Sequence, residues 1–221
     1  RRPPRSTLFP YTTLFRSVAF NLVRLHRLGF RVPPGFIITT EVFRCREVIE
    51  GYEPARQNFH DQVLAHLRRL EEKTGLRFGD PRRPLLLSVR SGASISQPGM
   101  MDTLLNVGNN EAVTRGLAER TGNPWFAWDC YRRFLQSYGM AHDLERDAFD
   151  ALIDESKKRW GVPLKRLFSG EQMREVALAY RRLIEDAGIA VIDDPLAQLL
   201  LAVRRVLDSW ESPKARTYRR I

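Results

Sequence analysis

The chain has 221 residues, 43% hydrophobic and 28% charged, which is typical of a globular protein with one sizeable domain or two smaller ones. No segment approaches the roughly 20 apolar residues of a membrane helix. The net charge is +10, but four positive charges lie in the first 17 residues, which contain no acid, and the others alternate with acids as on solvated helix faces. We therefore expect a cytoplasmic protein that binds neither membrane nor nucleic acid.

The first 17 residues differ in character from the rest. Residues 7–17 read TLFPYTTLFRS, which resembles one reading frame of a sequencing-adapter oligonucleotide. The segment shows no helical or strand period. We expect residues 1–17 to be an unstructured artefact, with natural sequence missing before Val18; the alternative is a genuine β-prone arm.

The first predicted elements are short. Leucines at helical spacing predict a helix over residues 20–28, which Gly29 would end. The rigid turn at Pro33 and Pro34 then precedes a predicted strand at residues 36–38. A further helix is expected from Thr39 or Thr40 to about residue 49.

The next elements lead to a loop of unusual composition. An apolar stripe predicts a helix over residues 57–73, ended by Gly75. The apolar run at residues 85–89 predicts a buried strand. Residues 91–103 then contain glycines, a proline and several hydroxyl side chains without any period, which indicates a loop.

The second half of the chain is predicted to be almost entirely helical. Its last helix is the clearest, because six aliphatic residues follow one stripe after Asp193 and Asp194. The sequence therefore divides into a mixed α/β part up to about Leu105 and a helical part. The predicted helices are 110–120, 124–138, 145–160, 169–187 and 194–210.

The most informative chemistry lies where the buried strand meets the loop. Arg90 would stand at the carboxyl end of the strand, and its guanidinium suits phosphate oxygens. Gly92 allows close backbone approach, and Ser91 adds a hydroxyl. These residues could hold a polyphosphate, but the pattern is neither a P-loop nor a dinucleotide fingerprint. An equally simple interpretation is a structural junction in which Arg90 pairs with a nearby carboxylate.

A family resemblance favours the phosphate interpretation. Residues 88–108 read SVRSGASISQPGMMDTLLNVG, which closely resembles a signature of the pyruvate, phosphate dikinases. The stretches GFRVPPGFIITT (29–40), LRFGDP (76–81) and YRRF (131–134) are similar to further blocks of that family. The resemblance runs from about residue 20 to the C-terminus.

The resemblance implies an α+β fold that forms the N-terminal portion of an ATP-grasp domain with a large all-helical insertion. It implies a first α/β subdomain at residues 18–108 and a helical subdomain at 109–192. Residues 193–221 would begin the remaining ATP-grasp subdomain. The chain would then be a fragment of a longer enzyme.

The resemblance also implies a function. Members of the family convert ATP, phosphate and pyruvate to AMP, diphosphate and phosphoenolpyruvate through a phosphohistidine. Arg90 would be an ATP-phosphate ligand, and Ser91, Asp102 and Thr103 would support it. The Mg²⁺ ligands, the phosphohistidine domain and the pyruvate-binding domain would lie outside this chain, so no catalytic residue or metal ligand is assigned within it. The whole enzyme is expected to be a homodimer, and the chain alone is not expected to catalyse the reaction.

Departures from the family leave alternatives open. Val18, Ala19 and Phe20 stand where the family has a segment with a phosphate-binding lysine. The four histidines lack the family's phosphohistidine motif and are interpreted as structural or surface residues. Arg132 and Arg133 are expected outside the core or paired, and contact of one of them with nucleotide is a further hypothesis. The alternatives are a phosphoenolpyruvate synthase-type dikinase and a non-catalytic nucleotide-binding or interaction module.

Overall fold

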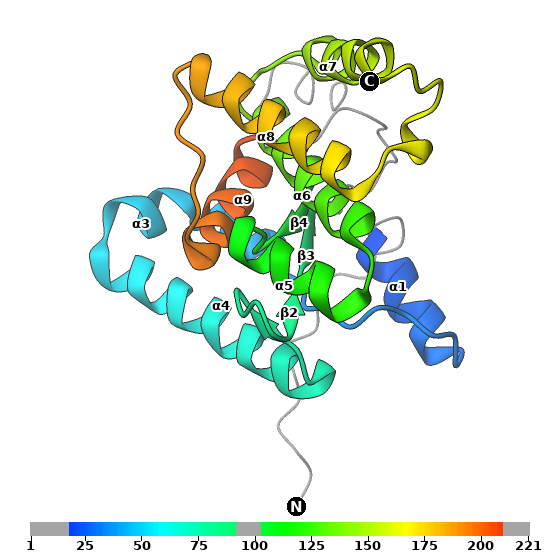
Figure 1. Ribbon diagram of the computed structural model, residues 1–221. Coiled ribbons are helices and arrows are strands. Elements are labelled where there is room, and N and C mark those ends of the chain that lie inside the picture. Colours follow the sequence, from blue (N-terminus) through cyan, green and yellow to red (C-terminus); the bar gives the residue numbers. More distant parts are fainter. Residues whose placement is uncertain (1–17, 92–102, 210–221) are drawn as a thin grey trace, which may run out of the picture.

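The computed structural model describes residues 18–91 and 103–209, and Figure 1 shows them as helices around a few short strands. The expected artefact at residues 1–17 lies outside the described residues, as do residues 210–221. The mostly helical content with small sheets agrees with the predicted α+β class. None of the helices in the described ranges is both long enough and apolar enough to cross a membrane.

The first helix is confirmed, but the segment after it differs from the prediction. Helix α1 covers Val18–Arg27, and Gly29 follows with a left-handed φ of +83°. The predicted strand at 36–38 is wrong: these residues pair with no strand of the described chain, and Phe36 instead packs on the His66 ring, 5.8 Å between centroids. A short strand needs a hydrogen-bonding partner, which its sequence alone does not reveal.

Two short helices replace the predicted helix at 39–49. They are α2, Thr40–Arg44, and α3, Arg46–Gly51, separated at Cys45. Cys45 has φ −91° and ψ 8°, in the bridge region between helix and strand conformations. The prediction missed this break because no Gly or Pro marks it.

Helix α4 covers Glu53–Thr74 and confirms the predicted helix at 57–73. It begins earlier because Pro54 occupies its first turn, where a missing N–H costs nothing. Gly75 ends it in the left-handed conformation, as expected. The buried members of its predicted stripe are Val63, Leu67 and Leu70.

Four short strands form two separate pairs. Strand β1, Arg77–Phe78, pairs in parallel with β2, Pro84–Leu85. Strand β3, Leu87–Arg90, pairs antiparallel with β4, Thr103–Val107. The predicted strand at 85–89 is therefore divided between β2 and β3, and neither β1 nor β4 was predicted.

The helices of the second half are all confirmed within two residues at each end. Asn110 and Asn123 cap α5 and α6 by accepting a backbone N–H, and a capping box of Ser169 and Gln172 starts α8. A short 3₁₀ turn, Lys165–Leu167, precedes α8. The five helices are α5 Glu111–Thr121, α6 Pro124–Met140, α7 Arg146–Trp160, α8 Gly170–Asp186 and α9 Pro195–Ser209.

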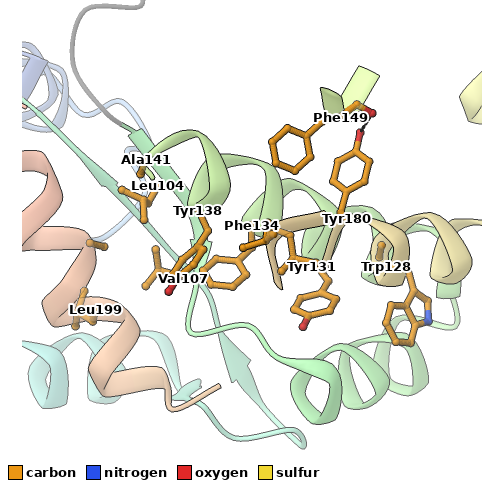
Figure 2. Close-up of a cluster of buried hydrophobic side chains, with 14 of the residues drawn as sticks. Leu104, Val107, Trp128, Tyr131, Phe134, Tyr138, Ala141, Phe149, Tyr180 and Leu199 are labelled. Carbon is orange, nitrogen blue, oxygen red and sulfur yellow. Dashed lines mark hydrogen bonds between the residues drawn. The ribbon is translucent and has the colours of Figure 1, made fainter. Parts of the chain in front are cut away.

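The hydrophobic core is centred on α6 and joins the two halves of the chain. Tyr131, Phe134 and Tyr138 of α6 are almost completely buried. Figure 2 shows them with Leu104 and Val107 of β4 in one cluster. Leu199 of α9 and Tyr180 of α8 belong to the same cluster. Strand β4 is thus packed against α6, which follows shortly after it, and against α9, which comes much later in the sequence.

Candidate functional site

Two of the four predicted site residues face each other across the β3–β4 pair. Arg90, the last residue of β3, is the direct partner of Thr103, the first residue of β4, and both are exposed. Ser91 follows β3 and is half-buried. Asp102 lies outside the described residues. The geometry therefore brings Arg90 and Thr103 together where β3 ends and β4 begins.

Arg90 has no acidic partner among residues 18–91 and 103–209. The ion pairs of these ranges all involve other arginines and lysines. Within the described chain, a structural junction in which Arg90 pairs with a carboxylate is therefore not observed. Its guanidinium is exposed at the end of a strand, where a planar fork of donors can meet an anion.

Helix α6 holds the back of β4 through two polar contacts. The Leu105 N–H donates to Ser137 Oγ at 3.0 Å, and Asn106 Nδ2 donates to the Cys130 carbonyl oxygen at 2.9 Å. Ser137 Oγ itself donates to the Phe134 carbonyl, 2.9 Å away. These bonds tie the strand that carries Thr103 to the helix at the centre of the core.

Helix α9 holds the end of β4 through one buried side chain. Gln198 is only 1% exposed, and its Oε1 accepts the Gly108 N–H at 2.8 Å. Its Nε2 donates to the carbonyl oxygens of Asn109, at 2.8 Å, and Ile192, at 2.7 Å. One glutamine thus satisfies three backbone groups where β4, α9 and the segment before α9 meet.

A network of three charged side chains connects α6 with the 3₁₀ turn before α8, and it engages Arg132, one of the candidate nucleotide contacts. Asp129 Oδ1 accepts from Arg132 Nε at 2.8 Å and from Lys165 Nζ at 3.0 Å. Burial by itself raises the pKa of Asp129. The hydrogen bonds and positive charges of Arg132 and Lys165 lower it by more than burial raises it, so the pKa lies below its usual value. Because Arg132 is buried and used in this network, the structure does not support its contact with nucleotide; Arg133 is exposed.

The thiol of Cys130 is unsuited to chemistry. Burial, assisted by Asp129, raises its pKa to about 11. A thiol of that pKa is protonated near neutral pH and therefore a poor nucleophile. Its backbone carbonyl, which accepts from Asn106, is the part of Cys130 that supports the β3–β4 pair.

A groove of about 470 Å³ lies between α3, α4 and α9, and it includes none of the predicted site residues. Its walls are mainly aliphatic, with Phe59 among them. Three arginines also line it, but Arg46 and Arg204 face Glu50, and Arg56 pairs with Glu53. The groove therefore offers little free positive charge for a phosphate.

The histidines of the described chain make structural contacts or face solvent. His66 Nδ1 lies 2.9 Å from the Gln62 carbonyl, and His142 Nδ1 lies 2.8 Å from the Tyr138 carbonyl. Within the two described ranges, no three His, Cys, Asp or Glu side chains lie close enough to hold a metal ion. We assign no metal ligand to these residues.

Sequence reasoning missed two residues that support the site, although each left a signal. Asn106 is a poor strand former inside the apolar run of β4, two residues before Gly108, and such a pattern is typical of a bulge. Gln198 interrupts the apolar stripe of α9, and a polar residue at a core position usually has buried hydrogen-bond partners.

Comparison with known proteins gives a consistent result. Residues 54–221 match the family model described as pyruvate phosphate dikinase, AMP/ATP-binding domain. The chain is 39% identical over 204 residues to the pyruvate, phosphate dikinase of Clostridium symbiosum, covering 91% of this chain and 23% of that protein. It is 42% identical over 203 residues to pyruvate, phosphate dikinase 2 of Zea mays, with the same coverage.

A protist relative shows the same pattern. The pyruvate, phosphate dikinase of Giardia intestinalis is 40% identical over 203 residues, which cover 90% of this chain and 22% of the relative. The chain thus spans less than a quarter of the length of the curated relatives it matches. The similarity covers the β3–β4 pair and the helices that support it.

Proposed function

Because the chain belongs to the pyruvate, phosphate dikinase family, through its AMP/ATP-binding domain, we propose that it supplies Arg90 as a ligand of the ATP phosphates. The observation that carries this proposal is the exposed guanidinium of Arg90 at the end of β3, without an acidic partner in the described chain. Phosphoryl transfer depends on positioning and on neutralising negative charge, and a guanidinium contributes to both.

Thr103, Ser91 and Asp102 have supporting roles in this proposal. The Thr103 residue is paired with Arg90 across the strands, so its hydroxyl can donate to an anion held by Arg90. Ser91 continues directly from β3 and can do the same. Asp102 shapes the loop or contacts the nucleotide.

The wider proposal concerns the protein to which this chain belongs. It is a dikinase that converts ATP, phosphate and pyruvate to AMP, diphosphate and phosphoenolpyruvate through a phosphohistidine on another domain. We infer an ATP-grasp fold, with residues 18–108 as its first subdomain, 109–192 as the helical subdomain and 193–221 as the start of the rest. We propose that the Mg²⁺ ligands and the other domains lie in sequence beyond this chain, and that the whole enzyme is a cytoplasmic homodimer.

Replacement of Arg90 by Ala is expected to weaken ATP binding about 10- to 100-fold, because a charge-assisted contact to phosphate is lost. Isothermal titration calorimetry of the 221-residue chain measures the affinity. Arg90→Lys keeps the charge but not the planar fork, so it should be intermediate. AMP, which has fewer phosphates, should lose less affinity than ATP.

The matched control is Arg182→Ala, which removes an exposed arginine from α8 and leaves the β3–β4 pair intact. It should bind ATP as the unchanged chain does. An ATP affinity of Arg90→Ala within twofold of the unchanged chain would remove Arg90 from the site. An equal loss in both variants would point to net charge and not to a specific contact.

A chimera tests the activity of the whole protein. Residues 21–221 replace the corresponding segment of the Clostridium symbiosum enzyme, which keeps its own N-terminal lysine segment and its remaining domains. We expect AMP to form from ATP in the presence of phosphate and pyruvate, and Arg90→Ala in the chimera to slow it. A folded chimera that forms no AMP would favour a non-catalytic module. AMP formation without phosphate would favour the phosphoenolpyruvate synthase type.

A further inference from the structure

The β3–β4 pair contains a bulge whose position decides which way Arg90 faces. Leu87 is paired with Val107, and Val89 with Leu104. Two residue steps on β3 therefore oppose three on β4, so β4 carries one extra residue. A bulge of this kind bends the strand and re-aims the side chains beyond it.

The extra residue keeps a charged side chain and a core side chain on opposite faces. Directly opposed residues of an antiparallel pair share a face, and a slip of one residue exchanges the two faces. With the bulge, exposed Arg90 faces exposed Thr103, and Val89 faces Leu104, which is 1% exposed. Without it, the pairing that starts at Leu87 and Val107 would bring Arg90 opposite Leu104.

Asn106 occupies the bulge in an unusual backbone conformation. Its φ is +54°, in the left-handed region that residues other than Gly rarely adopt. Asn tolerates this region better than most residues. Its Nδ2 donates to the Cys130 carbonyl at 2.9 Å, and the neighbouring Leu105 N–H donates to Ser137 Oγ at 3.0 Å. Both the backbone preference of Asn106 and its contact with α6 therefore favour the bulge.

We propose that Asn106 is a positioning residue for Arg90, the proposed ligand of the ATP phosphates. Asn106 holds the bulge that places Arg90 and Thr103 together on the solvent face. The inference rests on the proposed role of Arg90 in binding ATP. Asn106 acts through the strand register and touches no substrate. Through its hydrogen bond to Cys130, Asn106 connects helix α6 with the strand pair that carries Arg90 and Thr103.

The test compares Asn106→Val with Asn106→Gly. A β-branched residue is a strong outlier at positive φ, whereas Gly adopts it freely. We expect Asn106→Val to lose the cross-strand nuclear Overhauser contacts between residues 90 and 103 and to bind ATP about 10- to 100-fold more weakly. Asn106→Gly should keep those contacts and bind ATP within about threefold of the unchanged chain. Rescue by Gly, which removes the side chain entirely, separates backbone positioning from simple loss of packing.

Two further variants keep the result decisive. If Asn106→Val does not fold, Asn106→Ala presents the same backbone conflict in milder form. Ile153→Val in α7 removes a buried methyl group far from β4, and it should lower stability without changing ATP affinity or the cross-strand contacts.

The outcomes distinguish this inference from the proposed function. Unchanged contacts between residues 90 and 103 in Asn106→Val would overturn the positioning role. The same conclusion follows if Arg90→Ala weakens ATP binding and Asn106→Val does not. If Arg90→Ala leaves ATP binding unchanged, the proposed function fails. Loss of the strand register in Asn106→Val would then show that Asn106 maintains the bulge but has no role in ATP binding.

Discussion

Asp129→Asn is expected to lower the free energy of unfolding by about 3–5 kcal/mol, because it leaves a buried arginine without its counter-charge. The Arg132 side chain is 7% exposed, so water cannot replace the carboxylate. The substitution keeps the shape of the side chain and removes only its charge. Urea unfolding of the 221-residue chain, followed by tryptophan fluorescence, measures the loss.

Comparison within the network tests the physical cause. Lys165 is 32% exposed, so Lys165→Met should cost less than Asp129→Asn. The control Asp154→Asn removes a carboxylate that pairs with Lys157 on the surface of α7, and it should leave the unfolding midpoint unchanged. A loss for Asp129→Asn no larger than that for the control would show that the network adds nothing to stability.

The dependence of this effect on pH has a definite sign. The pKa of Asp129 is lower in the folded chain than its usual value of 3.8. A carboxyl with a lowered folded-state pKa stabilises the fold above its unfolded-state pKa, and the stabilisation disappears as pH falls through the folded-state value. The difference between the unchanged chain and Asp129→Asn should therefore be full near neutral pH and shrink below about pH 4.

Gln198→Leu is the second variant with a large expected effect, a loss of roughly 3 kcal/mol or more. It leaves the Gly108 N–H and the carbonyl groups of Asn109 and Ile192 without their partner, and each buried unsatisfied group costs about 1–3 kcal/mol. Leu preserves volume and helix propensity, so the loss reports the hydrogen bonds. Urea unfolding gives the free energy, and amide hydrogen exchange at Gly108 should become faster.

Two comparisons refine this result. A protonated Glu at position 198 can still accept the Gly108 N–H but can donate to only one of the two carbonyls. The loss of unfolding free energy in Gln198→Glu should therefore lie between zero and that of Gln198→Leu. Gln62→Leu makes the same change at an exposed position of α4 and should stay within about 0.5 kcal/mol of the unchanged chain. Unaltered exchange at Gly108 in Gln198→Leu would show that the Gln198 side chain does not protect the Gly108 N–H.

The helices were predictable because their signals are local. The cap residues Asn110, Asn123 and Ser169 each precede a periodic apolar run, and these helices begin where the sequence indicates. Hydrogen bonds within a helix connect neighbours in sequence, so a short window contains most of the necessary information.

The strands were harder to predict because their partners are distant or bulged. β4 is a five-residue run that contains Asn106, and its existence depends on β3, α6 and α9. The segment at 36–38 has strand-like residues but no partner strand among those described. Propensity alone therefore predicted a strand that is absent and missed one that is present.

The site was only partly predictable, because its residue types are readable from the sequence but the contacts that support them join distant elements. Residue chemistry indicated Arg90, the family resemblance added Thr103, and the structure shows that the two are paired across two strands. Gln198 left only an indirect signal, as a polar residue within the apolar stripe of α9, and nothing local indicated that Ser137 supports the backbone behind them. Those contacts depend on where α6 and α9 pack, which is a property of the whole fold.

The hydrogen bonds that join β4 to α6 and α9 also have a consequence for the order of folding during synthesis. The hydrogen bond between Asn106 and Cys130 joins residues 24 positions apart, and the one between Gly108 and Gln198 joins residues 90 positions apart. Two short strands are marginally stable alone, so we expect the β3–β4 pair to become stable only after α9 has emerged from the ribosome. Roughly 100 residues lie between the end of β4 and the end of α9, so at about 5–20 residues per second the delay lasts about 5–20 seconds. The segment that carries Arg90 is therefore translated before the helices that hold it, and we expect it to reach its final form only once they are present.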